Sequence, residues 1–256
     1  MTHEPLGPDI FYPGSPAVLE QLTKELLKDR ETDPHRRRTV VIPHGWYESI
    51  GPLAAAAWGA VSWMQPRVIT LLLPVHTPEQ EDSITTVPVD RVNHPLGSHP
   101  VVPVQEVSTD QRYLLEEPAL DNSLPMIWKL FGEVPLRVFF ISGTSSRLAG
   151  QLARLLRSLD TPNTLYAAST NMTGVLSPDV TAEHLVRVLE LLGTPHQSSH
   201  APLLELFRKN MISPCGITIL EALRRTGILK GAYQILGQNT SATHGGRCTG
   251  YAGCIG

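Results

Sequence analysis

The chain has 256 residues, of which 41% are hydrophobic and 18% charged, and its formal net charge at pH 7 is -3. This composition predicts one globular domain over 1–256 and argues against a nucleic-acid binder that neutralises phosphates. Three cysteines make no disulfide framework, the N-terminus lacks a signal-peptide pattern, and no apolar run reaches the roughly 20 residues that span a membrane, so we expect a cytoplasmic protein.

The first third of the chain alternates helical and strand patterns. Leucines at helical spacing follow Ser15-Pro16, and the β-branched run Thr39–Ile42 is typical of a buried strand. Gly51-Pro52 then predicts the start of an alanine-rich helix, because proline is tolerated in a first helical turn. The apolar run 67–73 predicts a second strand, and the Pro-rich and Gly-rich region 79–107 predicts a hairpin or lid over the strand ends.

The same alternation continues to the end of the chain. The expected helices cover 109–131, 145–159, 179–192, 201–210 and 217–225, and the expected strands cover 136–141, 164–169, 230–236 and 247–252. This order of elements predicts the α/β class, with a single-domain mixed, largely parallel sheet flanked by helices.

Two histidines follow predicted strands directly. His44 lies in the sequence PHG after the first strand, and His76 lies in PVHT after the second. Ligands of open α/β sheets bind beyond the carboxyl ends of the strands, so both histidines are candidate site residues. They could converge if the two strands are neighbours, as sequential strands often are.

A cysteine and a polar segment complete the candidate set. Cys215 precedes the helix expected at 217–225, and Ser169-Thr170-Asn171 follows another strand. Imidazole and thiolate together suit a transition metal, and three protein ligands with one open position are typical of a catalytic metal site. The spacings of 32 and 139 residues match no compact ligand motif, so ordinary loop histidines and a buried structural thiol remain open alternatives.

A series of segments, in the same order and spacing, resembles a known family. They are FYPGSP, VVIPHGWYESIGPLAAAAW, LLLPVHT, HPLG, LPMIWKLFG, YAASTN, CGITILEAL and TGYAG. On these segments the chain resembles the Memo family, whose prokaryotic members are called protein B of the AmmeMemoRadiSam system. The Memo fold resembles the LigB-type class III extradiol dioxygenases, which are non-haem iron enzymes that open catechol rings. The resemblance therefore implies a Memo/LigB-like fold and an iron site.

The resemblance also assigns residues. It places the family's metal ligands on His44, His76 and Cys215, with Fe(II) as the expected metal and Cu or Zn as alternatives. Other polar positions differ from the family pattern. Asp121 stands at a family glutamate, Asn171 at an aspartate, and Gly174 at the histidine that looks like the acid/base of the dioxygenases. Ordinary extradiol cleavage is therefore in doubt, because a histidine near neutral pKa is what would deprotonate a catechol.

We therefore predict a mononuclear non-haem iron oxygenase or oxidase that acts with O2 on a small polar or aromatic metabolite. Asn171 and Asp121 are the predicted catalytic residues, although Asn171 could equally cap a turn. The predicted substrate contacts are Trp46, Tyr47, His99 and His244. Aromatic packing is the simpler explanation for the first two, and a loop position for His99.

Two functions from other classes remain open. The chain could be a non-catalytic, Memo-like module that binds a peptide or protein partner, because animal Memo proteins are associated with receptor signalling. It could also be a Cys-His hydrolase, with Cys215 as nucleophile and His44 or His76 as base. The sequence does not indicate the oligomeric state or the substrate.

Overall fold

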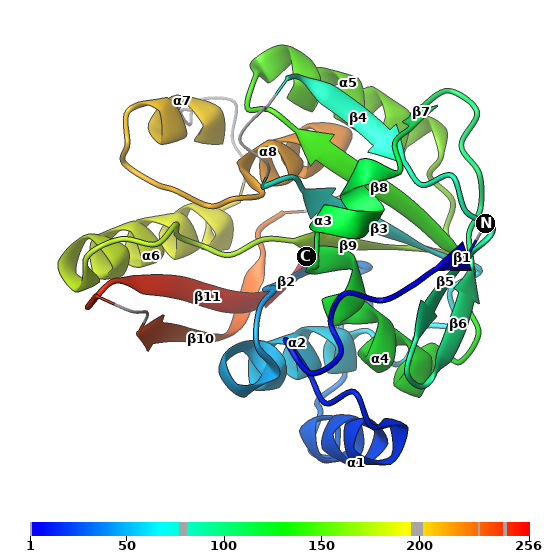
Figure 1. Cartoon of the computed structure of the whole chain (residues 1–256). Helices are drawn as coiled ribbons and strands as arrows, with labels where there is room; N and C mark the ends of the chain where they lie inside the picture. Colours follow the sequence, from blue (N-terminus) through cyan, green and yellow to red (C-terminus); the bar gives the residue numbers. More distant parts are fainter. Residues whose placement is uncertain (1, 77–80, 196–201, 230, 243–244) are drawn as a thin grey trace.

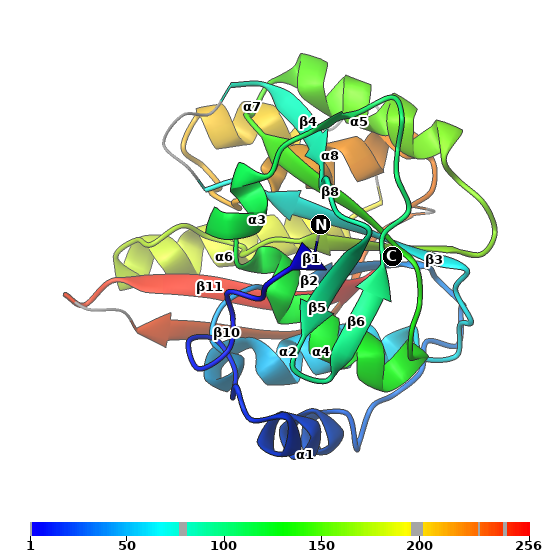
Figure 2. The same cartoon turned by 45° about the vertical axis from the view of Figure 1, so that its right-hand side comes forward.

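The fold is built on one large sheet with helices on both faces (Figures 1 and 2). The computed structural model describes residues 2–76, 81–195, 202–229, 231–242 and 245–256. Among them the large sheet has eight strands in the order β10-β11-β2-β9-β3-β8-β4-β7. These strands are β2 (Thr39–Ile42), β3 (Val68–Pro74), β4 (Ser83–Thr86), β7 (Ser108–Thr109), β8 (Leu136–Ser142), β9 (Thr164–Ser169), β10 (Gln234–Ala242) and β11 (Cys248–Ile255).

The centre of this sheet is parallel and its margins are mixed. Strands β2, β9, β3 and β8 run parallel to one another, whereas β11 pairs antiparallel with β2 and with β10, and β4 pairs antiparallel with β8. The predicted α/β class with a mixed, largely parallel sheet is confirmed.

The helices form two layers. One face carries α1 (Pro16–Leu26), α2 (Tyr47–Ala60) and α4 (Ala119–Phe131), and the other carries α5 (Ser146–Ser158), α6 (Pro178–Gly193), α7 (Leu203–Arg208) and α8 (Ile217–Thr226). Side chains alternate between the two faces of a strand, so Val40 and Ile42 enter the core with α2 while Val41 enters the core with α5. Within the described residues, no helix combines the length and apolarity needed to cross a membrane.

The region expected to form a hairpin or lid contains a second, small sheet. Strands β5 (Arg91–His94) and β6 (Gly97–Pro100) form an antiparallel hairpin, and β1 (Thr2–His3) pairs parallel with β5. The sheet contacts α4. The N-terminal segment thus joins a hairpin 89 residues further along the chain, as Figure 2 shows.

Two predicted helix boundaries are wrong, and both lie near a proline. Helix α2 begins at Tyr47, because the N–H groups of Ser49 and Ile50 already close a first turn on the Trp46 carbonyl, and Pro52 therefore lies inside the helix. The region predicted as helical over 109–131 is divided into α3 (Arg112–Glu116) and α4. Glu117 separates them in an extended conformation, as expected for a residue that precedes a proline.

The C-terminal strands also differ from their predicted ranges. Strand β10 begins at Gln234 and continues to Ala242, and the predicted start at Lys230 lies outside the described residues. Strand β11 continues to Ile255 because its last residues pair with β2. The sheet thus extends both strands beyond what their own sequences indicate.

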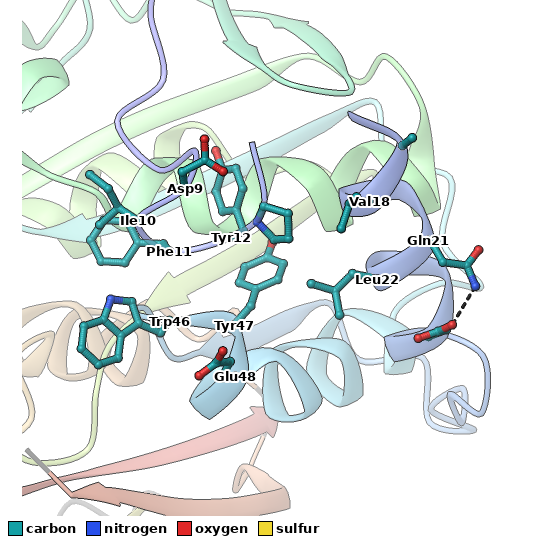
Figure 3. A pocket seen from close by; sticks show the side chains of 13 residues that line it. Asp9, Ile10, Phe11, Tyr12, Val18, Gln21, Leu22, Trp46, Tyr47 and Glu48 are labelled. Carbon is teal, nitrogen blue, oxygen red and sulfur yellow. Dashed lines mark hydrogen bonds between the residues drawn. The ribbon is translucent and has the colours of Figure 1, made fainter. Parts of the chain in front are cut away.

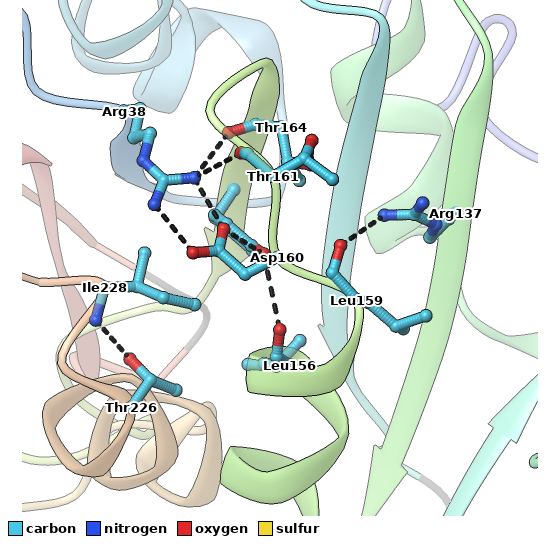
Figure 4. A network of polar contacts seen from close by, with 10 residues as sticks. Arg38, Arg137, Leu156, Leu159, Asp160, Thr161, Thr164, Thr226 and Ile228 are labelled. Carbon is cyan, nitrogen blue, oxygen red and sulfur yellow. Dashed lines mark hydrogen bonds and ion pairs between the residues drawn. The ribbon is translucent and has the colours of Figure 1, made fainter.

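A charged network fixes the end of the sheet where the parallel strands begin (Figure 4). Arg38, just before β2, binds both carboxylate oxygens of Asp160 at 2.6 and 2.9 Å. The Tyr166 hydroxyl of β9 donates to the same carboxylate at 2.9 Å. The Arg38 guanidinium holds the pKa of Asp160 below its ordinary value, so the ionised carboxylate joins β2 to the turn that leads into β9.

Asp160→Asn should lower the free energy of unfolding by about 1 kcal/mol at pH 7, allowing for partial exposure of the pair. Because the pKa of Asp160 is lower in the native state than in the unfolded state, the carboxylate stabilises the fold at pH values above the unfolded pKa of about 3.9. This stabilisation is lost as the pH falls through the native pKa. Urea unfolding at pH 7 and at about pH 3 checks this expectation. An equal difference in the free energy of unfolding between variant and parent at both pH values would contradict it.

Gly253→Ala should destabilise the fold by about 2 kcal/mol or more. A Cβ at Gly253 would lie only 2.4 Å from the Leu53 carbonyl oxygen, so β11 and α2 would have to separate. Gly193→Ala is the matched control, because a Cβ there meets nothing within 4 Å. Thermal unfolding of both variants tests the idea, and an unchanged Gly253 variant would refute it.

Candidate metal centre

Three side chains suited to a metal ion converge beyond the carboxyl ends of the parallel strands. His44 follows β2, His76 follows β3, and Cys215 precedes α8. One nitrogen of each imidazole and the cysteine sulfur all lie within 4.8 Å of one another. The structure therefore brings together the three residues that the sequence put forward as ligands.

The convergence does not arise in the way that we expected from the strand order. Strands β2 and β3 are not neighbours, because β9 lies between them and pairs with both. Strand β9 ends at Ser169. The Thr170 N–H donates to the Ile42 carbonyl at the end of β2, and Asn171 contacts both His44 and Cys215. The polar segment after β9 therefore joins the His44 segment to Cys215.

The His44 imidazole is held so that one nitrogen faces the cysteine. Its Nδ1 lies 2.8 Å from the Ser169 hydroxyl, and its backbone N–H donates to the Asn171 side-chain oxygen at 3.1 Å. Its Nε2 lies 3.7 Å from the Cys215 sulfur. Gly45 follows with a φ of 142°, which glycine adopts readily, and the chain can turn sharply after the ligand.

The His76 imidazole is oriented by a carboxylate. Glu117 accepts a hydrogen bond from the His76 backbone N–H, and its second oxygen lies 2.8 Å from Nδ1. Glu117 is buried, whereas 43% of the His76 side chain is exposed, so the site is open to solvent on this side. A carboxylate on the far nitrogen of a histidine is a common partner of metal-binding histidines.

Sequence reasoning missed Glu117. It lies next to Pro118, and that proline is what keeps it extended between α3 and α4. The Glu-Pro pair inside a predicted helix was the available signal, because it marks a break in the helix and an acidic side chain at the break. Ser169 was named only as part of its segment, and its contact with His44 was not predicted.

Hydrogen bonds and charge favour the thiolate form of Cys215. The Asn171 backbone N–H donates to its sulfur at 3.1 Å, and the Thr170 hydroxyl lies 3.6 Å away. Burial raises the pKa of the Cys215 thiol, but the His44 and His76 imidazoles outweigh burial and set the pKa well below its ordinary value.

The pKa of the neighbouring His76 is shifted in the opposite direction, to a higher value. Burial lowers the pKa of His76, but Cys215 and Glu117 outweigh burial and raise it to about 10. Without a metal, the site at neutral pH is thus a thiolate beside an imidazolium. Two imidazoles and a thiolate also fit a borderline metal ion such as Fe(II), Cu or Zn.

The two predicted catalytic residues occupy different surroundings. Asn171 contacts both His44 and Cys215. Asp121 is buried at the start of α4, where it accepts hydrogen bonds from the Leu6 and Gly7 backbone N–H groups. Burial raises the pKa of Asp121 to about 7. These contacts position the ligands and anchor the N-terminal segment, and both catalytic roles remain predictions.

The predicted substrate contacts among the described residues have surroundings of their own, apart from the candidate ligands. Trp46 and Tyr47 line a separate pocket of about 890 Å³ (Figure 3), and none of the three candidate ligands lines it. His99 is fully buried, with Nδ1 3.1 Å from the Val134 carbonyl oxygen and its ring against Trp128. These are the contacts of a packed core residue. His244 lies outside the described residues, and all four roles remain predictions.

Known proteins resemble this chain in sequence and in fold. No protein-family model matches it. A MEMO1 family protein of Nitrosopumilus maritimus (strain SCM1) is 22% identical over 190 residues, which cover 68% of this chain and 69% of that protein. The crystal structure of the uncharacterized protein JW3007 from Escherichia coli K12 matches with a TM-score of 0.51 and 15% identity, over 85% of this chain and 99% of that one. The resemblance to the Memo family and the predicted fold are confirmed.

In metal-free protein, Cys215 should react with iodoacetamide at pH 6 about as fast as at pH 8. An ordinary thiol, with a pKa of about 8.5, slows roughly tenfold for each pH unit below that value. Burial raises the pKa of Cys254 to about 12, so that residue should stay unreactive at both pH values. Peptide mass spectrometry over a pH series measures each cysteine separately, and a tenfold loss of Cys215 reactivity between pH 8 and pH 6 would contradict the thiolate.

Proposed function

We propose that this chain is a mononuclear non-haem iron enzyme, an oxygenase or oxidase that uses O2 on a small polar or aromatic metabolite. The convergence of His44, His76 and Cys215 within 4.8 Å supports it most directly. These are the residues that the resemblance to the Memo family implies as ligands, and similarity to a MEMO1 family protein adds support.

The surrounding residues determine which atoms would bind the metal. His44 and His76 would each offer Nε2, because Ser169 and Glu117 occupy the two Nδ1 atoms. Cys215 would offer its thiolate. Bound Fe(II) supplies one-electron chemistry with O2, which no side chain of the site can supply alone. Copper would supply related chemistry, whereas zinc would act only as a Lewis acid.

The altered acid/base set favours a reaction with few proton transfers to the protein. Gly174 stands where the family resemblance implies a histidine, and a Cβ built there meets nothing within 4 Å. Gly174 thus leaves open space where the histidine side chain would stand, and it has no side-chain proton donor of its own. Oxygen insertion, desaturation or C–C cleavage would need less acid/base help than ordinary catechol opening. In this proposal Asn171 positions the ligands, and Asp121 fixes the N-terminal segment beside α4.

One observation favours a second candidate, a Cys-His hydrolase. The thiolate of Cys215 lies beside the His44 and His76 imidazoles and immediately before α8, whose N-terminus favours negative charge. Cys215 would attack an acyl carbon, and an imidazolium would protonate the leaving group. The same contacts therefore suit a nucleophile and a metal ligand, and metal content separates the two functions.

Anaerobic reconstitution with Fe(II) tests the proposed function. We expect about one iron per chain in the parent protein and loss of bound iron in His76→Ala and Cys215→Ser. Glu117→Gln should keep the site but lower its iron affinity about 10–100-fold, because it weakens the orientation of His76. Cys248→Ser is the matched control, since Cys248 is also a partly exposed free cysteine. Elemental analysis after gel filtration gives the metal content.

The outcomes distinguish the candidates. Iron bound in the parent and the control but lost in the ligand variants, with O2 consumption by the iron-loaded protein, supports the iron enzyme. A parent that binds no iron overturns it. Acylation of Cys215 by an activated ester in metal-free protein, with turnover that needs a histidine, would instead establish the hydrolase.

A further inference from the structure

A second pocket lies where the N-terminal loop meets α1 and the start of α2 (Figure 3). Its volume of about 890 Å³ is in the range of small-molecule sites. Its lining shares no residue with the candidate metal centre. The residues that line it are Asp9, Ile10, Phe11, Tyr12, Pro13, Ala17, Val18, Gln21, Leu22, Glu25, Trp46, Tyr47 and Glu48.

Exposed apolar side chains gather at this pocket. Ile10 is 62% exposed, Val18 is 54% exposed and Trp46 is 58% exposed. Six large apolar side chains are exposed among the described residues, and these three lie around a single pocket. Scattered exposed apolar residues are normal, but a cluster rimmed by polar groups marks a binding surface.

The pocket wall is fixed by the backbone. The Gly7 carbonyl accepts the N–H of Phe11 at 2.8 Å, and the Phe11 carbonyl accepts the N–H of Tyr47 at 2.8 Å. Asp9 has a φ of 60°, an uncommon value for a residue with a side chain, and its carboxylate accepts the Gly14 N–H at 2.7 Å. The loop is therefore already folded against α2, and a ligand need not order it.

Aromatic packing supports the same wall. The rings of Tyr12 and Tyr47 lie 5.4 Å apart between centroids, and both side chains are buried. The Tyr47 hydroxyl donates to the Asn122 carbonyl at 2.7 Å, which joins this wall to α4. Trp46, in contrast, projects toward solvent at the pocket edge and leaves most of its ring available.

The charge of the lining has one sign. Asp9, Glu25 and Glu48 are acidic, and none of the described residues that line the pocket is a lysine, arginine or histidine. The Glu48 carboxylate beside the exposed ring of Trp46 (Figure 3) combines two features that attract an organic cation, namely negative charge and an aromatic face. An anionic ligand would be repelled, and a neutral one would gain no attraction from the carboxylates.

We propose that this pocket binds a small hydrophobic ammonium compound. Its apolar body would lie against Phe11 and Trp46, and its ammonium group would face Glu48, the carboxylate drawn beside Trp46 in Figure 3. The proposal does not depend on the iron chemistry, because the pocket is complete in metal-free protein.

Three probes of similar size distinguish the contribution of charge to binding from that of apolar contact. They are 2-phenylethylamine, which is cationic at pH 7, 2-phenylethanol, which is neutral, and phenylacetate, which is anionic. Calorimetric titration of the full metal-free chain should show the amine binding about fivefold or more tighter than the alcohol, and phenylacetate binding weakest. In nitrogen-15 spectra the indole signal of Trp46 should shift, whereas those of Trp58, Trp63 and Trp128 should not.

Variants test the two parts of the proposed site. Glu48→Gln should reduce the preference for the amine over the alcohol about two- to fivefold, whereas Glu190→Gln, on an exposed part of α6, should leave it unchanged. Trp46→Leu keeps an apolar side chain but removes the ring, so amine affinity should fall more than alcohol affinity.

Several results would overturn the proposal. Equal affinities for the three probes, equal effects of the Glu48 and Glu190 variants, or no movement of the Trp46 signal with about 10 mM amine would each refute it. Circular dichroism of every variant confirms that binding losses do not come from unfolding.

Discussion

The geometry of the candidate metal centre depends on the hydrogen bonds of Asn171. Its side-chain oxygen accepts the His44 N–H, and its backbone N–H donates to the Cys215 sulfur, so one residue sets the distance between two proposed ligands. It can do so because β9 pairs with β2, so that Asn171, just past the end of β9, lies beside the segment that carries His44. A different strand order would leave the same three ligands in the sequence without bringing them together.

The negative charges of Cys215 and Glu117 favour either a proton on His76 or a bound metal ion. In metal-free protein the Cys215 thiolate and Glu117 retain a proton on His76, which raises its pKa to about 10. A metal ion that binds Nε2 must displace that proton, and it gains a thiolate that is already ionised. Glu117 assists in both states, because it holds the imidazole by Nδ1 and compensates positive charge on the ring or on the metal. The contacts that make a thiolate-imidazolium pair therefore also prepare a metal site.

Much of the fold follows from local patterns, and the failures have physical causes. The β-branched run Thr39–Ile42 matches β2 residue for residue, because a short, fully buried strand needs apolar residues on both faces. Strand order depends on packing between distant segments, so no local pattern could place β9 between β2 and β3. Glu117 was not predicted for the same reason, because its role depends on a contact with His76, which is 41 residues away in the sequence. The two histidines were predictable because a strand end followed by histidine has a chemical meaning of its own, whereas Cys215, which precedes a helix, was joined to them by the family resemblance.

The short segment from His44 to Tyr47 carries a ligand of the candidate metal centre at one end and two residues of the second pocket, Trp46 and Tyr47, at the other. The structure nevertheless separates the two sites. Asn122 binds both the N–H and the carbonyl of Gly45 through its side-chain amide, and its own carbonyl accepts the Tyr47 hydroxyl. Helix α4 thus holds the segment on both sides of Trp46. A ligand that contacts the exposed Trp46 ring would act on a fixed backbone and would not displace His44. The two sites should therefore bind their ligands independently, because coupling requires an element with two arrangements and these hydrogen bonds favour only one.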